Sequence, residues 1–244
     1  MVQPTEQELL AILEELTDLA ELHSRSNLNL CLQGGMTELL SLILSHESAR
    51  VRKATCHLLT SITSNNRQVQ EFASKSGAIN LVSQFAKEET LAVKDAVFGS
   101  LAAWIKADNF EGKRRFISEK DGLEFLKRLF CDSALNENFN MRLKKKVVNL
   151  IYDLVVNDDG IFEDNPFHVR QHFCDDQAFL EKLRVTLTNA QLSDMQELQY
   201  RDSVLLIIYG LHQYKPEVVG PLLKPALFLH RGAIVAVTED PNAD

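Results

Sequence analysis

The chain has 244 residues, 45% of them hydrophobic and 25% charged, and its formal net charge at pH 7 is −8. Only 10 glycines and 6 prolines occur, too few for a β-rich fold with many tight turns. The negative charge argues against a general nucleic-acid-binding protein, which needs a basic surface to meet phosphates. The sequence contains no run of about 18 apolar residues and therefore predicts no transmembrane helix, so we expect no membrane partner.

The first predicted helix runs from about Thr5 to Leu22. Thr5 and Glu8 form a capping-box pattern, and leucines follow at helical spacing. Through Ser24 the segment carries six acidic residues and no basic one, which we interpret as a solvated face. This acidic, amphipathic start predicts neither a secretory signal nor a transit peptide.

A repeat appears next in the chain. Gly35, Gly77 and Gly122 each open the pattern G-x-x-x-L, at spacings of 42 and 45 residues. A polar break and a longer apolar helix follow each glycine: "ARVRKATCHLLTSI", "LAVKDAVFGSLAAWI" and "MRLKKKVVNLIYDLV". Since glycine adopts positive φ at little cost, we expect these glycines at the corners between helices. When the first two long helices are aligned with a shift of 42 residues, Asn66 aligns with Asp108.

A period of about 40–47 residues with two or three helices is typical of armadillo and HEAT arrays. We therefore predict an all-α fold, an armadillo- or HEAT-like right-handed solenoid of about four repeats with helical caps. The predicted parts are N-terminal capping helices at 1–34, armadillo repeats at 35–156, a loop at 157–168, a degenerate fourth repeat and C-terminal cap at 169–237, and a disordered tail at 238–244.

Motifs that carry chemistry are largely absent from the sequence, which contains no phosphate-binding loop, nucleophile elbow or HExxH. We therefore expect no enzyme, no catalytic residue, no metal and no cofactor. The nearest approach to a metal site is His168 and His172 at i, i+4, with Cys174 and Asp175 just beyond. We interpret this segment as a partly exposed linker helix, with a zinc site as the alternative.

The four cysteines are far apart and form no CxxC pair. We expect buried hydrophobic or reduced thiols rather than a disulfide framework. The cysteines are Cys31, Cys56, Cys131 and Cys174.

The long last helix of each repeat carries the predicted binding surface. When the apolar positions that we expect to be buried are set aside, polar residues remain on one face of these helices. The segment "MRLKKK" adds a basic patch suited to an acidic partner. We predict that these residues form a strip on the concave face that contacts a partner. The strip consists of Lys53, His57, Ser61, Asp95, Arg142, Lys145, Asn149 and Asp153.

Four motifs resemble the armadillo-type nucleotide exchange factors of DnaK-like (seventy-kilodalton heat-shock) chaperones, the Hsp-binding-protein/Fes/Sil group. They are "LQGGMTELL", "VRKATCHLLTSITSNNRQVQE", "FISEKDGLEFL" and "LKKKVVNLIYDLV", and the resemblance covers roughly residues 8–156. The sequence departs from the family in "SNLNLCLQGG", in "KADN" at the second break, and in an insertion at 131–140.

The resemblance implies a co-chaperone that grips one lobe of the chaperone ATPase domain and promotes ADP release without a cofactor. It also implies a chaperone partner, and we expect a monomer. The alternative is a generic armadillo adaptor that binds a peptide segment. Such grooves use repeated Trp and Asn residues, whereas this chain has one tryptophan, Trp104, which we expect to pack inward. We expect a cytoplasmic protein, with the endoplasmic reticulum lumen as the alternative.

Overall fold

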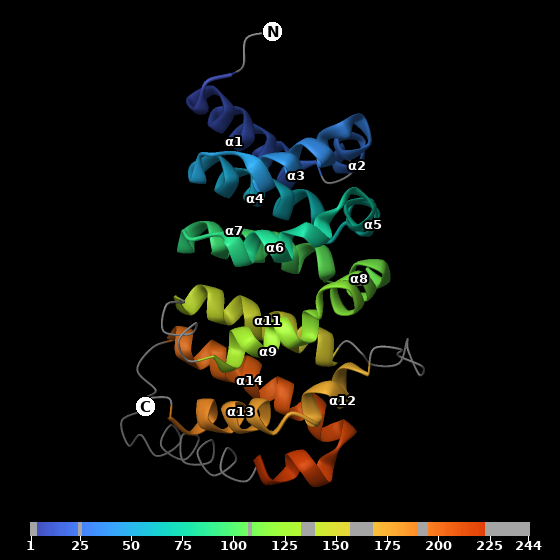
Figure 1. Ribbon diagram of the computed structural model, residues 1–244, viewed down its shortest axis with the longest axis vertical. Helices are drawn as coiled ribbons and strands as arrows, with labels where there is room; N and C mark the ends of the chain where they lie inside the picture. The colour runs from blue at the N-terminus through green and yellow to red at the C-terminus, as the bar shows by residue number, and fades with distance from the viewer. Residues whose placement is uncertain are drawn as a thin grey trace, which may run out of the picture. The chain divides into compact units, whose positions relative to one another are not determined.

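The predicted all-α class is confirmed by the computed structural model, in which every regular element of the described residues is a helix (Figure 1). The chain divides into two compact units, Met1–Phe125 and Leu126–Asp244, and each is described by itself. The structure describes residues 4–23, 26–106, 109–132, 140–156, 168–189 and 195–222. The predicted tail, most of the predicted loop and most of the 131–140 insertion lie outside these ranges.

The helices of the first unit follow a leading helix in groups of three. The leading helix is α1 (Glu6–Leu22). The first group is α2 (Asn27–Leu30) with the π turn Cys31–Gly35, then α3 (Met36–Ser45) and α4 (Ala49–Thr63). The second is α5 (Arg67–Ser76) with the 3₁₀ turn Ala78–Asn80, then α6 (Leu81–Lys87) and α7 (Leu91–Ile105). Next come α8 (Phe110–Lys120) and α9 (Gly122–Cys131), which continues into the second unit.

The longest helices of the first unit form one layer, in which α1 packs on α4 and α4 on α7 (Figure 1). The helices α4 and α7 begin at residues 49 and 91, a shift of 42, and each has 15 residues. Their apolar faces are buried, and Leu59 and its equivalent Leu101 are both fully enclosed. Each such side chain contributes roughly 1.5–3 kcal/mol when it leaves water. The predicted repeat shift is thus confirmed for these two helices.

The corners between helices use left-handed residues, but two of them differ from the prediction. Gly77 has φ 97° and ends α5, as expected. In the first repeat the corner residue is Gly34 with φ 95°, and Gly35 itself is helical. Before α9 the corner residue is Asp121, with φ 47°, and not Gly122. Gly122 instead allows close packing, because a Cβ there would lie 2.4 Å from an aromatic ring of α8.

The "NNRQVQ" break holds the ends of α4 and α7 together. Asn65 turns the chain with φ 54°, and the Asn66 side chain caps the first turn of α5. The buried amide of Gln70 then donates from Nε2 to the Thr63 carbonyl at 3.1 Å and to the Ala103 carbonyl at 2.8 Å. Both acceptors are among the last four carbonyls of α4 and α7, which have no partner within their own helices. The Thr63 carbonyl also accepts from the Asn66 amide at 3.2 Å.

Replacing Gln70 by leucine is expected to lower the free energy of unfolding by about 2 kcal/mol, because the buried Ala103 carbonyl loses the Gln70 donor and the Thr63 carbonyl keeps only the Asn66 amide. Gln68→Leu is the matched control, since Gln68 lies on the same helix and is exposed. Urea denaturation followed by the fluorescence of Trp104, the single tryptophan, measures both variants. Equal midpoints for the two variants would contradict the structural role of Gln70.

The asparagine cap of the second break is Asn109, one residue later than the predicted alignment with Asp108. Its Oδ1 accepts from the Gly112 amide at 3.1 Å, and its Nδ2 donates to the Trp104 carbonyl at 2.6 Å. One additional residue after α7 shifts α8 to position 110, a shift of 43 from α5. The departure "KADN" therefore preserves the cap.

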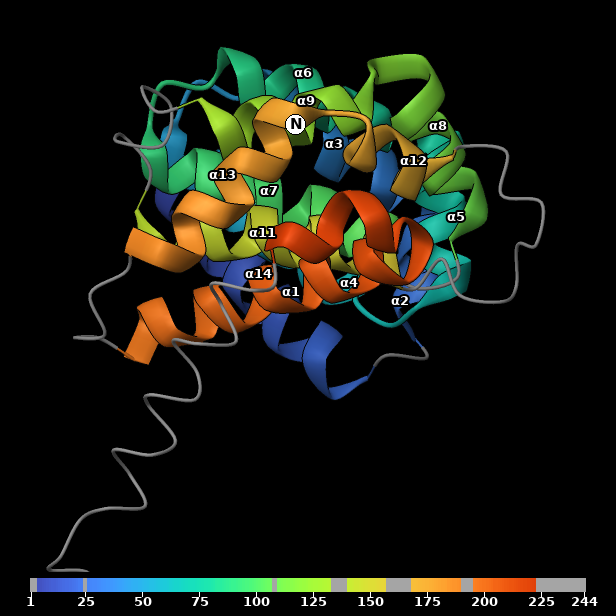
Figure 2. The ribbon, with the colours of Figure 1, turned by 90° about the horizontal axis from the view of Figure 1, so that it is seen from below.

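In the part of the second unit that the structure describes, the end of α9 is followed by four helices and then by helical residues 216–222. The four helices are α11 (Met141–Val156), α12 (Val169–Cys174), α13 (Gln177–Asn189) and α14 (Met195–Tyr214). The helices α11, α12 and α13 each pack on α14 (Figure 1 and Figure 2). Phe130, Phe173 and Phe179 form the aromatic centre, with ring centroids 5.3 Å apart for the first and last and 4.7 Å for the last two.

Contrary to the expectation from the sequence, the stretch Asn27–Ser45 has 19 residues and is apolar enough to cross a membrane by length and composition alone. The helix is interrupted at Gly34, whose φ and ψ are not helical. Its second part, α3, packs on α4 and buries four large apolar side chains, Met36, Leu39, Leu40 and Ile43. The apolar surface of α3 therefore serves the core of the first unit.

Candidate partner-binding surface

The α4 part of the predicted strip is at the surface of the first unit. Lys53 and His57 are exposed, and Ser61 is half-buried. Residues four apart in a helix share a face, so the three side chains follow one line along α4. The Ser61 hydroxyl donates to Oε1 of Glu21 at 3.1 Å, which links the end of this line to α1.

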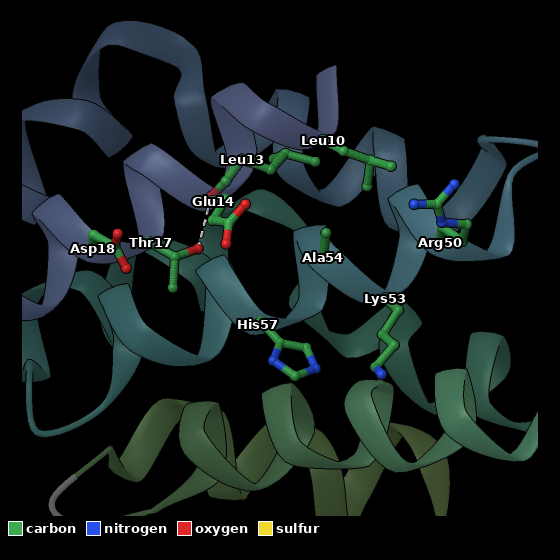
Figure 3. Close-up of a pocket in the computed structure, with 9 residues that line it drawn as sticks. All are labelled: Leu10, Leu13, Glu14, Thr17, Asp18, Arg50, Lys53, Ala54 and His57. Carbon is green, nitrogen blue, oxygen red and sulfur yellow. Dashed lines mark hydrogen bonds between the residues drawn. The ribbon is translucent and has the colours of Figure 1, made fainter. Parts of the chain in front are cut away.

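Lys53 and His57 also line an open pocket of about 440 Å³ between α1 and α4, here called the α1–α4 pocket (Figure 3). The acidic side chains come from α1 and the basic side chains from α4, so the two walls carry opposite charge (Figure 3). The other lining residues are Leu10, Leu13, Glu14, Thr17, Asp18, Arg50 and Ala54.

Asp95 occupies the position on α7 that corresponds to Lys53 on α4, but it is not exposed. Its exposed fraction is 8%. Most of α7 is buried, because this helix packs against α4, α5, α6 and α8 of the same unit. Asp95 is therefore not part of the exposed strip, and the prediction requires this correction.

The α11 part of the strip lies in the second unit, mostly against α14. Nζ of Lys145 donates to the side chain of Gln199, and the Ser203 hydroxyl donates to Oδ1 of Asn149 at 2.9 Å. Both α11 residues are half-buried, as is Asp153, whereas Arg142 is exposed. The predicted residues are thus on one helix as expected, but two of them, Lys145 and Asn149, already form hydrogen bonds with α14.

Sequence reasoning missed the ion pair that positions the start of α4. Nε and Nη2 of Arg52 bind the two carboxylate oxygens of Glu88 at 2.9 and 3.0 Å, 36 residues along the chain. Nη1 of Arg52 also donates to the carbonyls of His46 and Glu47. The exposed fractions are 16% for the Arg52 side chain and 3% for that of Glu88. No local pattern marks this pair, because its members come from different repeats.

Trp104 is fully buried, and its indole Nε1 donates to the Ser74 hydroxyl at 2.8 Å. The predicted inward packing is confirmed. Its ring is unavailable to a bound peptide, so the feature on which peptide-binding armadillo grooves rely is missing from the described part of this surface.

Residues 27–192 match the model of the SIL1/FES1/HPBP1 C-terminal domain. The chain belongs to this family. The match confirms the resemblance to Hsp70 nucleotide exchange factors and supports an armadillo-like all-α fold. A search of curated proteins found no match. The family is one of co-chaperones that bind Hsp70 chaperones and is not a class of catalytic enzymes.

The histidine segment of this SIL1/FES1/HPBP1 family member contains a partly exposed helix, α12, as predicted, with His168 exposed and His172 half-buried. His168 is not within a helical turn but caps α12 in a left-handed conformation, with φ 45°. His172 lies in the last turn of α12, and Cys174 beside it is buried. Burial raises the pKa of the Cys174 thiol to about 11, which disfavours the thiolate that zinc requires. The described residues contain no group of three or more possible metal ligands.

The cysteines of the family member are all thiols; three are buried and Cys131 is half-buried. Burial raises the pKa of Cys31 to about 11, as it does for Cys174, so both remain protonated at pH 8. We expect iodoacetamide at pH 8 to modify Cys131 first, with the other three reacting at least tenfold more slowly. Mass spectrometry of timed samples checks this order, and unfolding in guanidinium should expose all four. Rapid modification of Cys31 in the folded protein would contradict its burial.

Proposed function

We propose that this SIL1/FES1/HPBP1 family member accelerates ADP release by binding the ATPase domain of an Hsp70 chaperone. The family match supports an exchange-factor role, and it is the observation that carries the proposal. The exposed face of α4, with Lys53 and His57, supplies the proposed contact surface in the first unit. In the second unit the proposed contact is the exposed Arg142 at the start of α11, with Lys145, Asn149 and Asp153 behind it.

The proposed mechanism requires differential binding and no cofactor. The protein must bind the open, ADP-poor form of the ATPase domain more tightly than the closed form. By linkage, ADP then weakens the binding of the protein by the same factor by which the protein weakens the binding of ADP. A surface that does not deform upon contact helps to select one form. The Arg52–Glu88 pair and the Gln70 hydrogen bonds join both ends of α4 to neighbouring segments, which suits this role.

The test is the release rate of a fluorescent ADP analogue from an Hsp70 chaperone, followed by stopped flow with increasing amounts of the protein. We expect an acceleration that rises with concentration and then saturates. The chaperone should also bind the protein more weakly when ADP is saturating. An unchanged release rate with both cytosolic and endoplasmic reticulum chaperones would overturn the proposal and favour a peptide-binding adaptor.

We also propose that the protein acts as a monomer in the cytoplasm, with the endoplasmic reticulum lumen as the alternative compartment. Light scattering measures the mass of the purified protein against the 27.6 kDa of one chain. Fractionation of cells that express the tagged full-length protein separates the two compartments.

A further inference from the structure

We propose that the α1–α4 pocket receives a lysine or arginine side chain from the surface of the Hsp70 ATPase domain. This inference rests on the proposed function and deepens it. The helix that forms the acidic wall, α1 (Glu6–Leu22), precedes the residues that match the family model, 27–192. The pocket therefore adds a contact built partly from sequence outside the family domain.

The acidic wall is suited to a cation. Glu14 and Asp18, one turn apart on α1, both line the pocket and are exposed. Among the described residues neither carboxylate has an ion pair with the basic side chains of α4, and the ion pair of Arg50 is made with Glu6 at 3.4 Å. The oxygens of two carboxylates can accept the several hydrogen bonds that an ammonium or guanidinium group donates.

The apolar lining between the walls matches the stem of the same side chain. Leu13 is buried, and Leu10 and Ala54 are half-buried beside it. Lysine and arginine place their methylene groups on apolar surface and keep the charged end in a polar environment. A volume of about 440 Å³ lies at the small end of the range for binding pockets, so it suits one or two side chains.

The basic wall determines the orientation of the partner. Arg50 and Lys53 line the α4 side, with His57 next to Lys53 (Figure 3). An acidic residue of the chaperone beside the incoming cation would meet these groups, and the reversed orientation would bring like charges together. Such pairing mainly specifies register and speeds the encounter.

A second copy of this chain that approaches through its own α1 is a poorer occupant than the chaperone. The helix α1 carries six acidic residues and no basic residue. Two copies that meet through α1 would therefore place carboxylates against carboxylates, which is unfavourable.

Two substitutions of equal charge on neighbouring residues test the pocket. Glu14→Lys places a positive charge on the acidic wall, whereas Glu15→Lys makes the same change at an exposed position of α1 outside the pocket. With full-length nucleotide-free Hsp70, we expect Glu14→Lys to raise the Kd at least tenfold and Glu15→Lys to raise it less than twofold. The Kd of the neutral variant Glu14→Gln/Asp18→Asn should lie between these two values. This variant provides a second measurement if Glu14→Lys perturbs folding.

The outcomes separate this inference from the proposed function. If the wild-type protein binds Hsp70 and accelerates ADP release while Glu14→Lys and Glu15→Lys have equal affinities, the pocket inference is wrong and the exchange function stands. If the wild-type protein neither binds Hsp70 nor changes ADP release, the proposed function itself fails. Weaker binding of Glu14→Lys together with a smaller dependence of the Kd on salt supports the predicted cation at the acidic wall.

Discussion

Replacing Arg52 by methionine is expected to lower the free energy of unfolding of the first unit by about 3–5 kcal/mol. The substitution removes the bidentate partner of Glu88 and leaves its carboxylate, 3% exposed, without the guanidinium. It also removes the donor of the His46 and Glu47 carbonyls. Methionine preserves most of the aliphatic volume, so the loss reports the buried charge rather than a cavity.

Arg50→Met is the matched control, because Arg50 lies on the same helix and its side chain is 75% exposed. Its pair with Glu6 is a surface ion pair, for which about 0–1 kcal/mol is expected. Trp104 lies in the first unit and is the only tryptophan, so its fluorescence during urea unfolding reports on this unit. A destabilisation by Arg52→Met no larger than that by Arg50→Met would show that the Arg52–Glu88 pair does not anchor α4.

The second large effect is expected on nucleotide exchange. The double substitution Lys53→Glu/His57→Glu reverses the charge of the exposed α4 face, where both side chains lie one turn apart. If this face meets Hsp70, the protein concentration for half-maximal acceleration of ADP release should rise by roughly 30-fold, equivalent to about 2 kcal/mol. The maximal release rate should change less, because the substitution weakens binding rather than the opening of the ATPase domain.

Lys87→Glu serves as the control for this experiment, because Lys87 is exposed at the end of α6 and is not part of the predicted strip. Circular dichroism spectra should be the same for both variants and the wild type. Equal half-maximal concentrations for the two variants would remove α4 from the proposed contact surface, although another face could still carry the exchange activity.

The helices and their boundaries could largely be predicted from local sequence. The Thr5–Glu8 capping box exists as predicted, with the Thr5 amide donating to Glu8 Oε2 at 2.8 Å. Caps and apolar spacing act within a few residues, so their hydrogen bonds and buried faces can be recognised without knowing what packs against them. One inserted residue was enough to hide Asn109 as the counterpart of Asn66, because the alignment assumed a constant period.

The candidate site was only partly predictable. The exposed line of Lys53 and His57 follows from helical periodicity alone. The burial of Asp95 and the engagement of Lys145 by α14 do not, since they depend on which helix packs against each face. The predicted corner at Gly122 failed for a related reason, whereas the one at Gly77 was correct. At Gly122, glycine is needed for close packing on an aromatic ring of α8 rather than for its own φ.

The sequence by itself determined the all-α class, the repeat of α4 and α7, and the family resemblance that the match over residues 27–192 confirmed. These properties arise from short-range periodicity and from motifs that each lie within one repeat. Only the tertiary structure decided the Arg52–Glu88 pair and the α1–α4 pocket. Both join helices that are distant in the chain, and their energies depend on burial and charge contacts that exist only after the helices have packed.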